Sequence, residues 1–515
     1  MPELENNSTR DAKRSPALES SRTAGLLDPL SQGTGAGRLT GDLAWLQALV
    51  DAELGLTRAL IRAGLVPLWM RGIVDDLSDA GTLDLVAIAE AGRAGGNPVM
   101  PLVKALGRAA EERRAGASDH IHVGATSQDI LDSAAMLVAH RVTAAVADAL
   151  ADLAGTLAAL AARHRTTPMA GRTLGQQASP TSFGLVVAGW LDAVVTARER
   201  VEAVRDALPV QLGGAVGNLA VLGDIVAARQ PSADPQIVVD TIIAGYAATL
   251  GLRAPVIPWH ANRLPITELG DALAGATGAV GAFALDVTVL ARTEIGELSE
   301  QLADGEGGSS AMPHKRNPVT AFLVVAAARR APGLLSTLHG SLLAEDQRPS
   351  GAWHAEWPTL RDLGSLTVAA TESAASLAAR LDVDAERMRA NLELTDGLIF
   401  SERVSTILGE ALGKRAAFEL VEAAARESVA THRPLRVVLS ARLVADGHPE
   451  TLRAAVWNAF DPDAALGNSG PMIDAVLARE RAQRDQTRRE EADHDRADTV
   501  YADTGRAATK RTELS

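Results

Sequence analysis

One short stretch, GEGGSSAMPHKRNPV at residues 305–319, gathers groups that could carry out acid–base chemistry. Its glycines allow the backbone freedom expected of a mobile catalytic lid, and Ser309 and Ser310 follow them. Lys315 adds positive charge, and the apolar run after Pro318 predicts a helix N-terminus, which favours an anion. A serine in such surroundings loses its proton more easily than a free serine. We therefore expect it to remove a proton from a carbon next to a carboxylate.

Other interpretations of this stretch agree less well with the residues. A phosphate-binding P-loop requires G-x-x-x-x-G-K-[ST], and no Lys-Ser or Lys-Thr pair follows these glycines. A plain Gly/Ser linker would not need the Met-Pro-His-Lys-Arg-Asn-Pro run behind it. The chain has 0 cysteines, which excludes disulfides, thiolate catalysis and cysteine zinc sites. The H-E-x-x-H pattern is also absent, so we expect no metal site.

Long helices must position this loop. Apolar periodicity predicts them at roughly 130–165, 181–208, 265–303, 318–346 and 362–390. Several exceed about 25 residues, which is typical of a bundle of extended helices. We predict an all-α protein with three helical domains, the central one a long-helix bundle.

The predicted division of the chain has five parts. They are a disordered N-terminal tail (1–35), an N-terminal helical domain (36–116), a central long-helix bundle (117–370) with the catalytic loop (305–318), a C-terminal helical domain (371–480) and a charged, disordered tail (481–515).

Composition narrows the class of protein. Hydrophobic residues make up 47% and aromatic residues 3%, so the core must be aliphatic. The net charge of −14 argues against nucleic acid or an anionic membrane surface as a partner. The N-terminus lacks the apolar run of a signal peptide, and no uninterrupted apolar stretch reaches about 18 residues. We expect a soluble, cytoplasmic protein without a membrane partner.

The loop also carries a family resemblance. GGSSAMPHKRNP closely resembles the G-S-S-x-M-P-x-K-x-N-P signature of the fumarase/aspartase superfamily. Six further blocks are similar to the bacterial 3-carboxy-cis,cis-muconate cycloisomerase branch: GNPVMPLVKALG (96–107), HIHVGATSQDILDS (120–133), GRTLGQQASPTSFG (171–184), VQLGGAVGNLAVLG (210–223), PWHANR (258–263) and RPSGAWHAEW (348–357).

This resemblance implies an all-α homotetramer whose central bundle contains about twenty helices. Each active site is then built from three subunits, and neither a metal nor an organic cofactor is needed. The substrate implied is a small di- or tricarboxylate.

The resemblance also implies roles for individual residues. Ser309 would be the general base, while Lys315 and Asn317 would bind a substrate carboxylate and stabilise the aci-carboxylate intermediate. Thr126 and Ser127, with His122 nearby, would hold another carboxylate. The implied substrate-binding set also includes Asn97, Gln176, Ser310, Met312 and Arg348.

Several residues keep a structural interpretation beside the functional one. His122 could simply begin a helix, and His314 could be exposed. His260 and His354 lie in Trp-flanked segments and could be packed core histidines. For Arg172 we expect an ion pair with a carboxylate rather than contact with substrate.

Three departures from the family pattern bear on the substrate. Leu174 stands where many members have a histidine that supplies a general acid for a departing amine. An amine leaves poorly without a proton, whereas a carboxylate or nitrite leaves as a stable anion. Leu174 therefore disfavours an adenylosuccinate-type lyase. Asn218 and Ala261 stand where muconate cycloisomerases are expected to carry hydroxyl residues, which would suit a smaller diacid.

Three hypotheses for function follow. The first is cycloisomerisation of 3-carboxy-cis,cis-muconate to 4-carboxymuconolactone. The second is a lyase that releases fumarate and a small anion from a substituted succinate, for example nitrosuccinate. The third is a structural homologue without catalysis, against which the intact Ser309, Lys315 and Asn317 argue.

Overall fold

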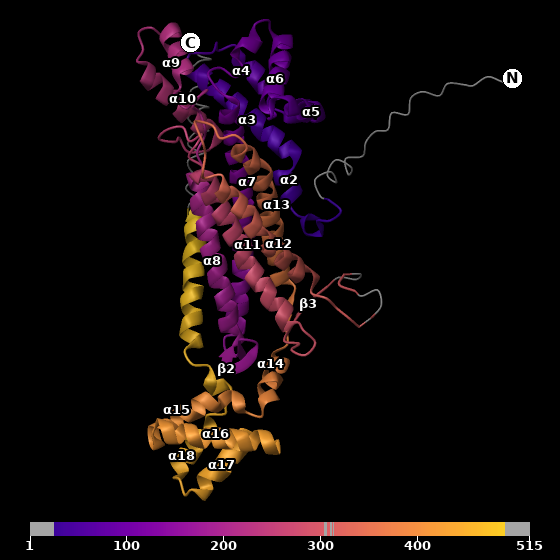
Figure 1. The fold of residues 1–515 in the computed structure, drawn as a ribbon, viewed down its shortest axis with the longest axis vertical. Helices are drawn as coiled ribbons and strands as arrows, with labels where there is room; N and C mark the ends of the chain where they lie inside the picture. Colours follow the sequence, from indigo (N-terminus) through magenta and orange to yellow (C-terminus); the bar gives the residue numbers. More distant parts are fainter. Residues whose placement is uncertain (1–24, 303–305, 309–311, 313, 490–515) are drawn as a thin grey trace, which may run out of the picture. The chain divides into compact units, whose positions relative to one another are not determined.

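The computed structural model describes residues 25–302, 306–308, 312 and 314–489. This part of the chain is overwhelmingly helical, which confirms the all-α prediction (Figure 1). The catalytic serines predicted from the sequence, Ser309 and Ser310, lie outside the described residues.

The α-helices of the N-terminal half are α2 (Ala36–Thr40), α3 (Asp42–Arg62), α4 (Met70–Asp76), α5 (Leu85–Gly95), α6 (Val99–Arg113), α7 (Ser127–Arg163), α8 (Phe183–Ala207), α9 (Ala220–Arg229) and α10 (Pro235–Leu250). Those that follow are α11 (Leu264–Leu290), α12 (Val319–Gly340), α13 (Ala352–Ala379), α14 (Ala385–Asn391), α15 (Ser401–Leu412), α16 (Lys414–Thr431), α17 (Leu435–Ala445) and α18 (Glu450–Asn458). Residues 469–489 are also helical, so the predicted C-terminal tail begins within a helix.

The described strands form two small antiparallel pairs. β1 (Pro168–Thr173) pairs with β2 (Gln176–Ser182), and β3 (Leu298–Glu300) pairs with β4 (Leu381–Val383). The second pair explains two errors in the predicted helices. The helix predicted at 265–303 ends at Leu290, and the segment predicted at 362–390 contains α13, β4 and α14. Periodicity could not reveal a pairing between strands about eighty residues apart.

The chain divides into two compact units, whose boundaries fall inside α7, α8, α11, α12 and α13. The first unit is Met1–Asp148, Glu199–Gly278 and Ala326–Ser373, and the second is Ala149–Arg198, Ala279–Val325 and Ala374–Ser515. The three-part division made from the sequence stays a prediction.

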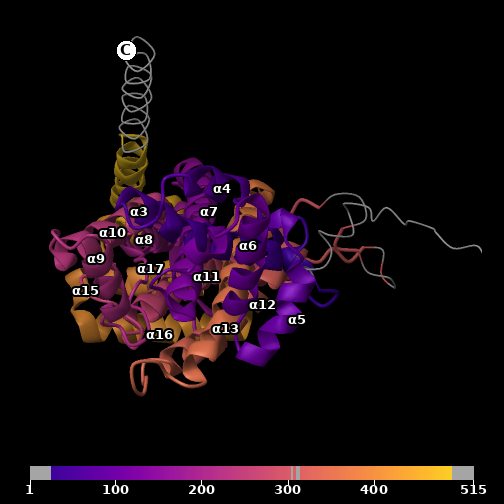
Figure 2. The ribbon, with the colours of Figure 1, turned by 90° about the horizontal axis from the view of Figure 1, so that it is seen from above.

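The first unit contains α3 to α6 and α9 with α10. In it α10 packs against both α3 and α9, as Figure 2 shows from above. Its core is aliphatic, as the composition predicts, with Leu54, Leu60 and Leu102 fully buried. This packing places the residue blocks 120–133, 210–223 and 258–263 within one unit.

The second unit contains the β1–β2 hairpin and α14 to α18. Its C-terminal helices share a core of buried aliphatic side chains together with Phe400 and Phe460. The segment from 306 to 320, which includes the described part of the catalytic loop, also belongs to this unit.

Three helices, α7, α11 and α12, are long and apolar enough to cross a membrane by length and composition alone. We interpret α7 and α11 as bundle helices because α7 begins with two buried, hydrogen-bonded carboxylates, and α11 carries the buried Thr277, hydrogen-bonded to Thr367. The absence of a membrane partner stays a prediction.

Candidate active site

The N-terminus of α7 is built around a capping arrangement. Thr126 precedes the first helical residue, Ser127, and its backbone N–H donates to Oδ2 of Asp129 at 2.9 Å. A side-chain acceptor three residues into a helix is typical of a capping box, and it satisfies a backbone donor that would otherwise have no partner. The Thr-Ser-Gln-Asp spacing therefore fixes where α7 begins.

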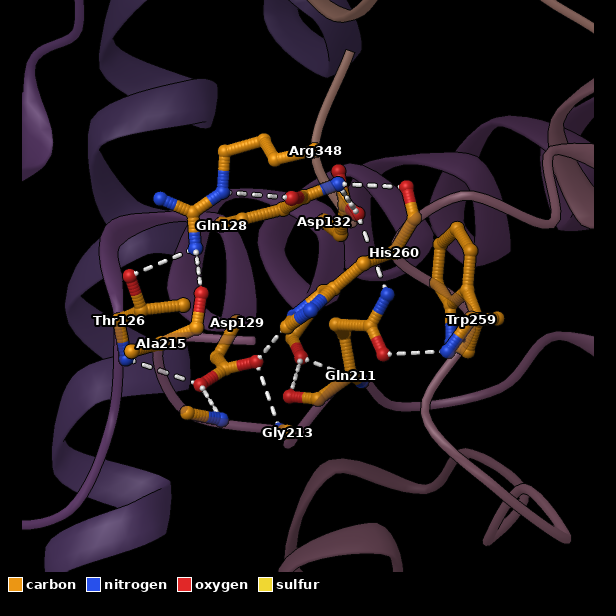
Figure 3. Close-up of polar contacts among 12 residues, drawn as sticks. Thr126, Gln128, Asp129, Asp132, Gln211, Gly213, Ala215, Trp259, His260 and Arg348 are labelled. Atoms are coloured by element: carbon orange, nitrogen blue, oxygen red, sulfur yellow. Dashed lines mark hydrogen bonds and ion pairs between the residues drawn. The ribbon is translucent and has the colours of Figure 1, made fainter. Parts of the chain in front are cut away.

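Asp129 also joins this helix start to two distant loops (Figure 3). Its fully buried carboxylate accepts hydrogen bonds from the backbone N–H groups of Gly213 at 2.8 Å and Gly214 at 3.0 Å. Nε2 of His260 lies 2.7 Å from Oδ1 of the same carboxylate. The backbone N–H of Thr126 is the fourth partner of this carboxylate. One side chain thus connects the start of α7 with the loop at Gly213 and Gly214 and with the loop that carries His260.

The loop that begins at Gly213 requires glycine for steric reasons. A Cβ atom on Gly213 would lie 2.8 Å from both Cε1 of His260 and Cβ of Pro258. Gly214 and Gly217 have φ of +69° and +82°, in the left-handed region that favours glycine. The GGAVG sequence therefore lets the backbone close around the His260 ring.

Arg348 brings the predicted carboxylate-binding residues together. Its Nη2 donates to Oγ1 of Thr126 at 2.9 Å and to the backbone oxygen of Ala215 at 3.2 Å, and its Nε donates to Oε1 of Gln128 at 3.0 Å. The side chain is half-buried. Figure 3 shows the guanidinium group beside Thr126 and Gln128. Two residues 222 positions apart in the sequence, Thr126 and Arg348, are therefore direct neighbours.

A second buried carboxylate, Asp132, lies one turn further along α7. It pairs with Arg263 at 2.9 Å, and Arg263 also pairs with Glu356 at 2.6 Å. Nε1 of Trp353 donates to Oδ1 of Asp132 at 2.9 Å. Burial lowers the pKa of Arg263, but its two carboxylate partners outweigh burial and raise the pKa above its usual value. Burial raises the pKa of Glu356, against the opposing effect of Arg263.

We call this set of residues the α7 network. It comprises Thr126, Gln128, Asp129, Asp132, Gln211, Gly213, Gly214, Ala215, His260, Arg263, Arg348, Trp353 and Glu356.

His122 lies just before the network and is paired with Glu53 of α3. Its Nδ1 is 2.8 Å from Oε2 of Glu53, and its φ is +60°. Burial lowers the pKa of His122, but the hydrogen bond to Glu53 and the negative charges of Glu53 and Asp129 raise it above the usual value overall. His122 is therefore paired with a buried carboxylate that favours its protonated form, and it also lies at the turn into α7.

Three other predicted binding residues lie in different settings. Asn97 lies in the turn before α6, where its Oδ1 accepts from the backbone N–H of Val99 at 3.0 Å. Ser127 is the first residue of α7 and is half-buried. Gln176 begins β2 in the second unit, where it is exposed. The structure therefore gives Asn97 a structural role in the turn that leads into α6.

The described part of the catalytic loop is closed at its base by backbone contacts. The backbone N–H and Nδ2 of Asn317 each donate to the carbonyl oxygen of Gly307 at 3.1 Å. Gly308 and Arg316 form an antiparallel bridge. The backbone N–H of Lys315, whose side chain is exposed, donates to the carbonyl oxygen of Met312 at 3.0 Å.

Arg380 holds the two flanks of this loop. Its Nη1 lies 3.1 Å from Oε2 of Glu306, at the start of the loop, and its Nη2 lies 3.0 Å from Oγ1 of Thr320, which follows the loop. Nη2 also lies 3.1 Å from Oε1 of the buried Glu300. Sequence reasoning missed Arg380, because nothing near it indicates a partner sixty or more residues away.

The other residues weighed from the sequence can now be placed. Arg172 forms a bidentate ion pair with Glu297 at 3.0 and 2.6 Å, which confirms its predicted structural role. His260 is 3% exposed. His314 is exposed in the described chain, and so is His354, whose ring contacts Trp353 and Trp357; of the two Trp-flanked histidines only His260 is buried.

Asp129 and His260 lie in blocks that carry the family resemblance, but the sequence assigned no role to Asp129 and left the role of His260 open. The signal for Asp129 was the Thr-x-x-Asp capping spacing before an apolar run. No comparable signal existed for His260, because its partner lies 131 residues away.

Two hollows stand out on the described surface, and neither is lined by a predicted site residue. One, of about 290 Å³, lies between the segment around Asp42 and the arginines Arg330 and Arg361. The other, of about 880 Å³, is formed by α15 and α16. Neither of these two hollows is therefore a substrate cavity formed by the candidate site residues of one chain.

Comparisons with known proteins identify relatives along nearly the whole chain. The sequence model of the lyase family matches residues 97–333. Nitrosuccinate lyase from Streptomyces davaonensis is 44% identical over 91% of this chain and 98% of that protein. The 3-carboxy-cis,cis-muconate cycloisomerase of Pseudomonas aeruginosa is 41% identical over 86% of this chain and 93% of that protein.

The fold agrees with these sequence relatives. The crystal structure of 3-carboxy-cis,cis-muconate lactonizing enzyme from Pseudomonas putida superimposes with a TM-score of 0.79 at 35% identity, covering 87% of this chain and 97% of that one. The helical fold, the loop signature and the full-length relatives agree, and the chain therefore belongs to the lyase family of the fumarase/aspartase superfamily.

Proposed function

We propose that this enzyme adds or eliminates an anionic group at the carbon β to a substrate carboxylate, without a cofactor. The contact between Thr126 and Arg348 carries the proposal, because a guanidinium group beside a hydroxyl at a helix N-terminus suits a carboxylate. In the described chain the hydrogen bonds of Arg348 use Nε and Nη2, which leaves Nη1 for a ligand.

The proposed chemistry is the same in both directions. In elimination, Ser309 removes a proton from the carbon α to a carboxylate, and the C–H electrons pass into that carboxylate to form an aci-carboxylate dianion. The bond from the β carbon to its substituent then breaks, and the substituent leaves with the electron pair. Lys315 and Asn317 stabilise the dianion, which is the costly intermediate. In cyclisation, a substrate carboxylate adds to the double bond and the proton returns to carbon.

The first candidate substrate is 3-carboxy-cis,cis-muconate, with 4-carboxymuconolactone as product. The relative from Pseudomonas aeruginosa and the structural neighbour from Pseudomonas putida, both named for this reaction, support it. Leu174 is consistent with this substrate as well. When the lactone opens, the leaving group is a carboxylate, which is stable as an anion and needs no proton from a histidine.

A second candidate is the elimination of a small anion from a substituted succinate to give fumarate. The 44% identity to nitrosuccinate lyase over 98% of that protein favours it. Asn218 and Ala261 also favour it, since both replace hydroxyl residues expected in the muconate enzymes. In the structure Oδ1 of Asn218 accepts from the backbone N–H of Ala220 at 3.2 Å, so this side chain also shapes the start of α9.

We further propose a cytoplasmic homotetramer whose active sites are shared between subunits and act on small di- or tricarboxylates. Only 22% of the apolar window of α12 is buried within one chain, and Phe322 on it is 46% exposed. An apolar helix face of this kind is suited to packing against other copies of the chain. Light scattering coupled to size exclusion measures the assembly; a monomer would contradict it.

An absorbance assay on the purified protein tests the function. Loss of 3-carboxy-cis,cis-muconate absorbance would support the first candidate. Appearance of fumarate absorbance from nitrosuccinate, without muconate turnover, would support the second. Activity on neither compound, nor on related carboxymuconates and substituted succinates, would contradict the proposed function.

A further inference from the structure

We propose that Asp129 and His260 are positioning residues that hold Thr126 and Arg348 ready for a substrate carboxylate. The inference rests on the proposed function, because it assumes that this pair binds a carboxylate. Neither Asp129 nor His260 is assigned a contact with substrate. They act on the ligand indirectly, by fixing the backbone of two loops that contact Arg348: the loop that ends at Thr126 and the loop at residues 213–215.

Each oxygen of the Asp129 carboxylate has two hydrogen-bond partners. Oδ1 receives Gly213 N–H and His260, and Oδ2 receives Thr126 N–H and Gly214 N–H. An ionised carboxylate only accepts, so all four partners must donate. An asparagine at this position would replace one carboxylate oxygen by an NH₂ group, which donates and cannot accept. Two of the four donors would then face another donor and lose their acceptor. The loops would then move apart.

His260 is held in one orientation by the same logic. Its Nε2 must carry the hydrogen that faces Asp129, so the neutral ring has its lone pair on Nδ1. Nδ1 is buried and has no hydrogen-bond partner among the described residues. A buried polar atom without a partner is costly, and an apolar side chain would avoid that cost. The presence of a histidine at this position is therefore explained by the hydrogen bond that Nε2 donates to Asp129, and not by the space that the ring fills.

Arg348 depends on both loops. Its Nη2 contacts Oγ1 of Thr126 on one loop and the carbonyl oxygen of Ala215 on the other. Asp129 fixes the backbone of Thr126 directly, and it fixes the residue immediately before Ala215 through Gly214 N–H. A shift of either loop would therefore turn the guanidinium group and misdirect Nη1.

The test uses the full-length protein with three substitutions: Asp129→Asn, His260→Leu and His260→Gln. Steady-state kinetics are measured on whichever substrate is turned over, and fumarate binding is measured by titration calorimetry. We expect Asp129→Asn and His260→Leu to raise KM about tenfold while kcat stays within about threefold. The reason is that these variants weaken binding of the carboxylate equally in the ground state and in the transition state. His260→Gln keeps an N–H donor and should recover most of the affinity.

Two controls separate positioning from general destabilisation. Thr277→Val removes the buried hydrogen bond between Thr277 and Thr367 in the same unit, and it should lower Tm without changing KM. In an Arg348→Lys background, Asp129→Asn should change KM by less than about twofold, since its effect acts through Arg348.

The outcomes are distinct from those that test the function. If neither candidate substrate is turned over but Asp129→Asn weakens fumarate binding, the proposed function fails and the positioning inference stands. Unchanged fumarate affinity and KM in folded Asp129→Asn and His260→Leu proteins would overturn the inference. So would full additivity with Arg348→Lys, or a wild-type protein that turns over neither candidate substrate and binds no fumarate.

Discussion

The predicted site residues are held in two different ways in the two units. In the α7 network, the fully buried Asp129 carboxylate accepts four donors, and the buried Arg263 is flanked by two carboxylates. In the catalytic loop, the exposed Lys315 and half-buried Asn317 make backbone contacts with loop neighbours, and Arg380, which is 32% exposed, holds the two ends of the loop.

This difference has an energetic basis. A buried charge is tolerated only when its partners are all in place, so the α7 network has one satisfactory arrangement. Ion pairs near solvent contribute little, and those at the loop flanks leave the backbone easier to rearrange. Binding a carboxylate benefits from the first kind of support. Moving a proton at the reacting carbon requires side chains that approach substrate, which the second kind permits.

The largest effect is expected at the loop. Ser309→Ala should lower kcat about 10³-fold or more, because a positioned general base typically contributes 10²–10⁴-fold. The oligomeric state and Tm should stay unchanged. Stopped-flow or long-time absorbance assays measure the residual turnover. Wild-type turnover in this variant would exclude Ser309 as the base.

The stability cost should fall mainly on the α7 network. Arg263→Leu leaves Asp132 and Glu356 buried without their cation, and we expect a loss of about 3–5 kcal/mol in the free energy of unfolding. Arg380→Leu should cost about 1–2 kcal/mol, because Arg380 is partly exposed and the buried Glu300 keeps the backbone N–H of Thr320 as a donor. Urea denaturation of both variants measures the comparison. An equal or larger cost for Arg380→Leu would contradict the distinction between the two regions.

The sequence anticipated local features of this comparison better than distant ones. Repeated apolar positions predicted the long helices, and the loop motif marked the segment that contains Lys315 and Asn317. The pairing of Arg172 with a carboxylate was also anticipated, although its partner was not. The contacts of Asp129 with Gly213 and His260 span 84 and 131 residues, so they depend on tertiary packing that no local pattern encodes.

A smaller effect concerns pH. The folded-state pKa of His122 is raised by Glu53, so the protonated pair stabilises the fold. This contribution is fully present below the ordinary value of 6.5 and is lost as the pH rises through the raised pKa. Relative to His122→Gln, the wild type should therefore have its largest Tm advantage in acid. Thermal unfolding across this range measures it; a Tm difference that does not vary with pH would contradict the ion pair.

The smallest expected effect is at Leu174, which belongs to neither region. Its side chain is fully exposed in the described chain, and its φ of +51° places it in the turn between β1 and β2. If the departing group leaves as an anion, a histidine here has no proton to supply that the reaction needs. Leu174→His should therefore leave kcat within about twofold of wild type, measured with the substrate that is turned over. A large gain would mean that protonation of the leaving group limits the reaction, and the argument for an anionic leaving group would fail.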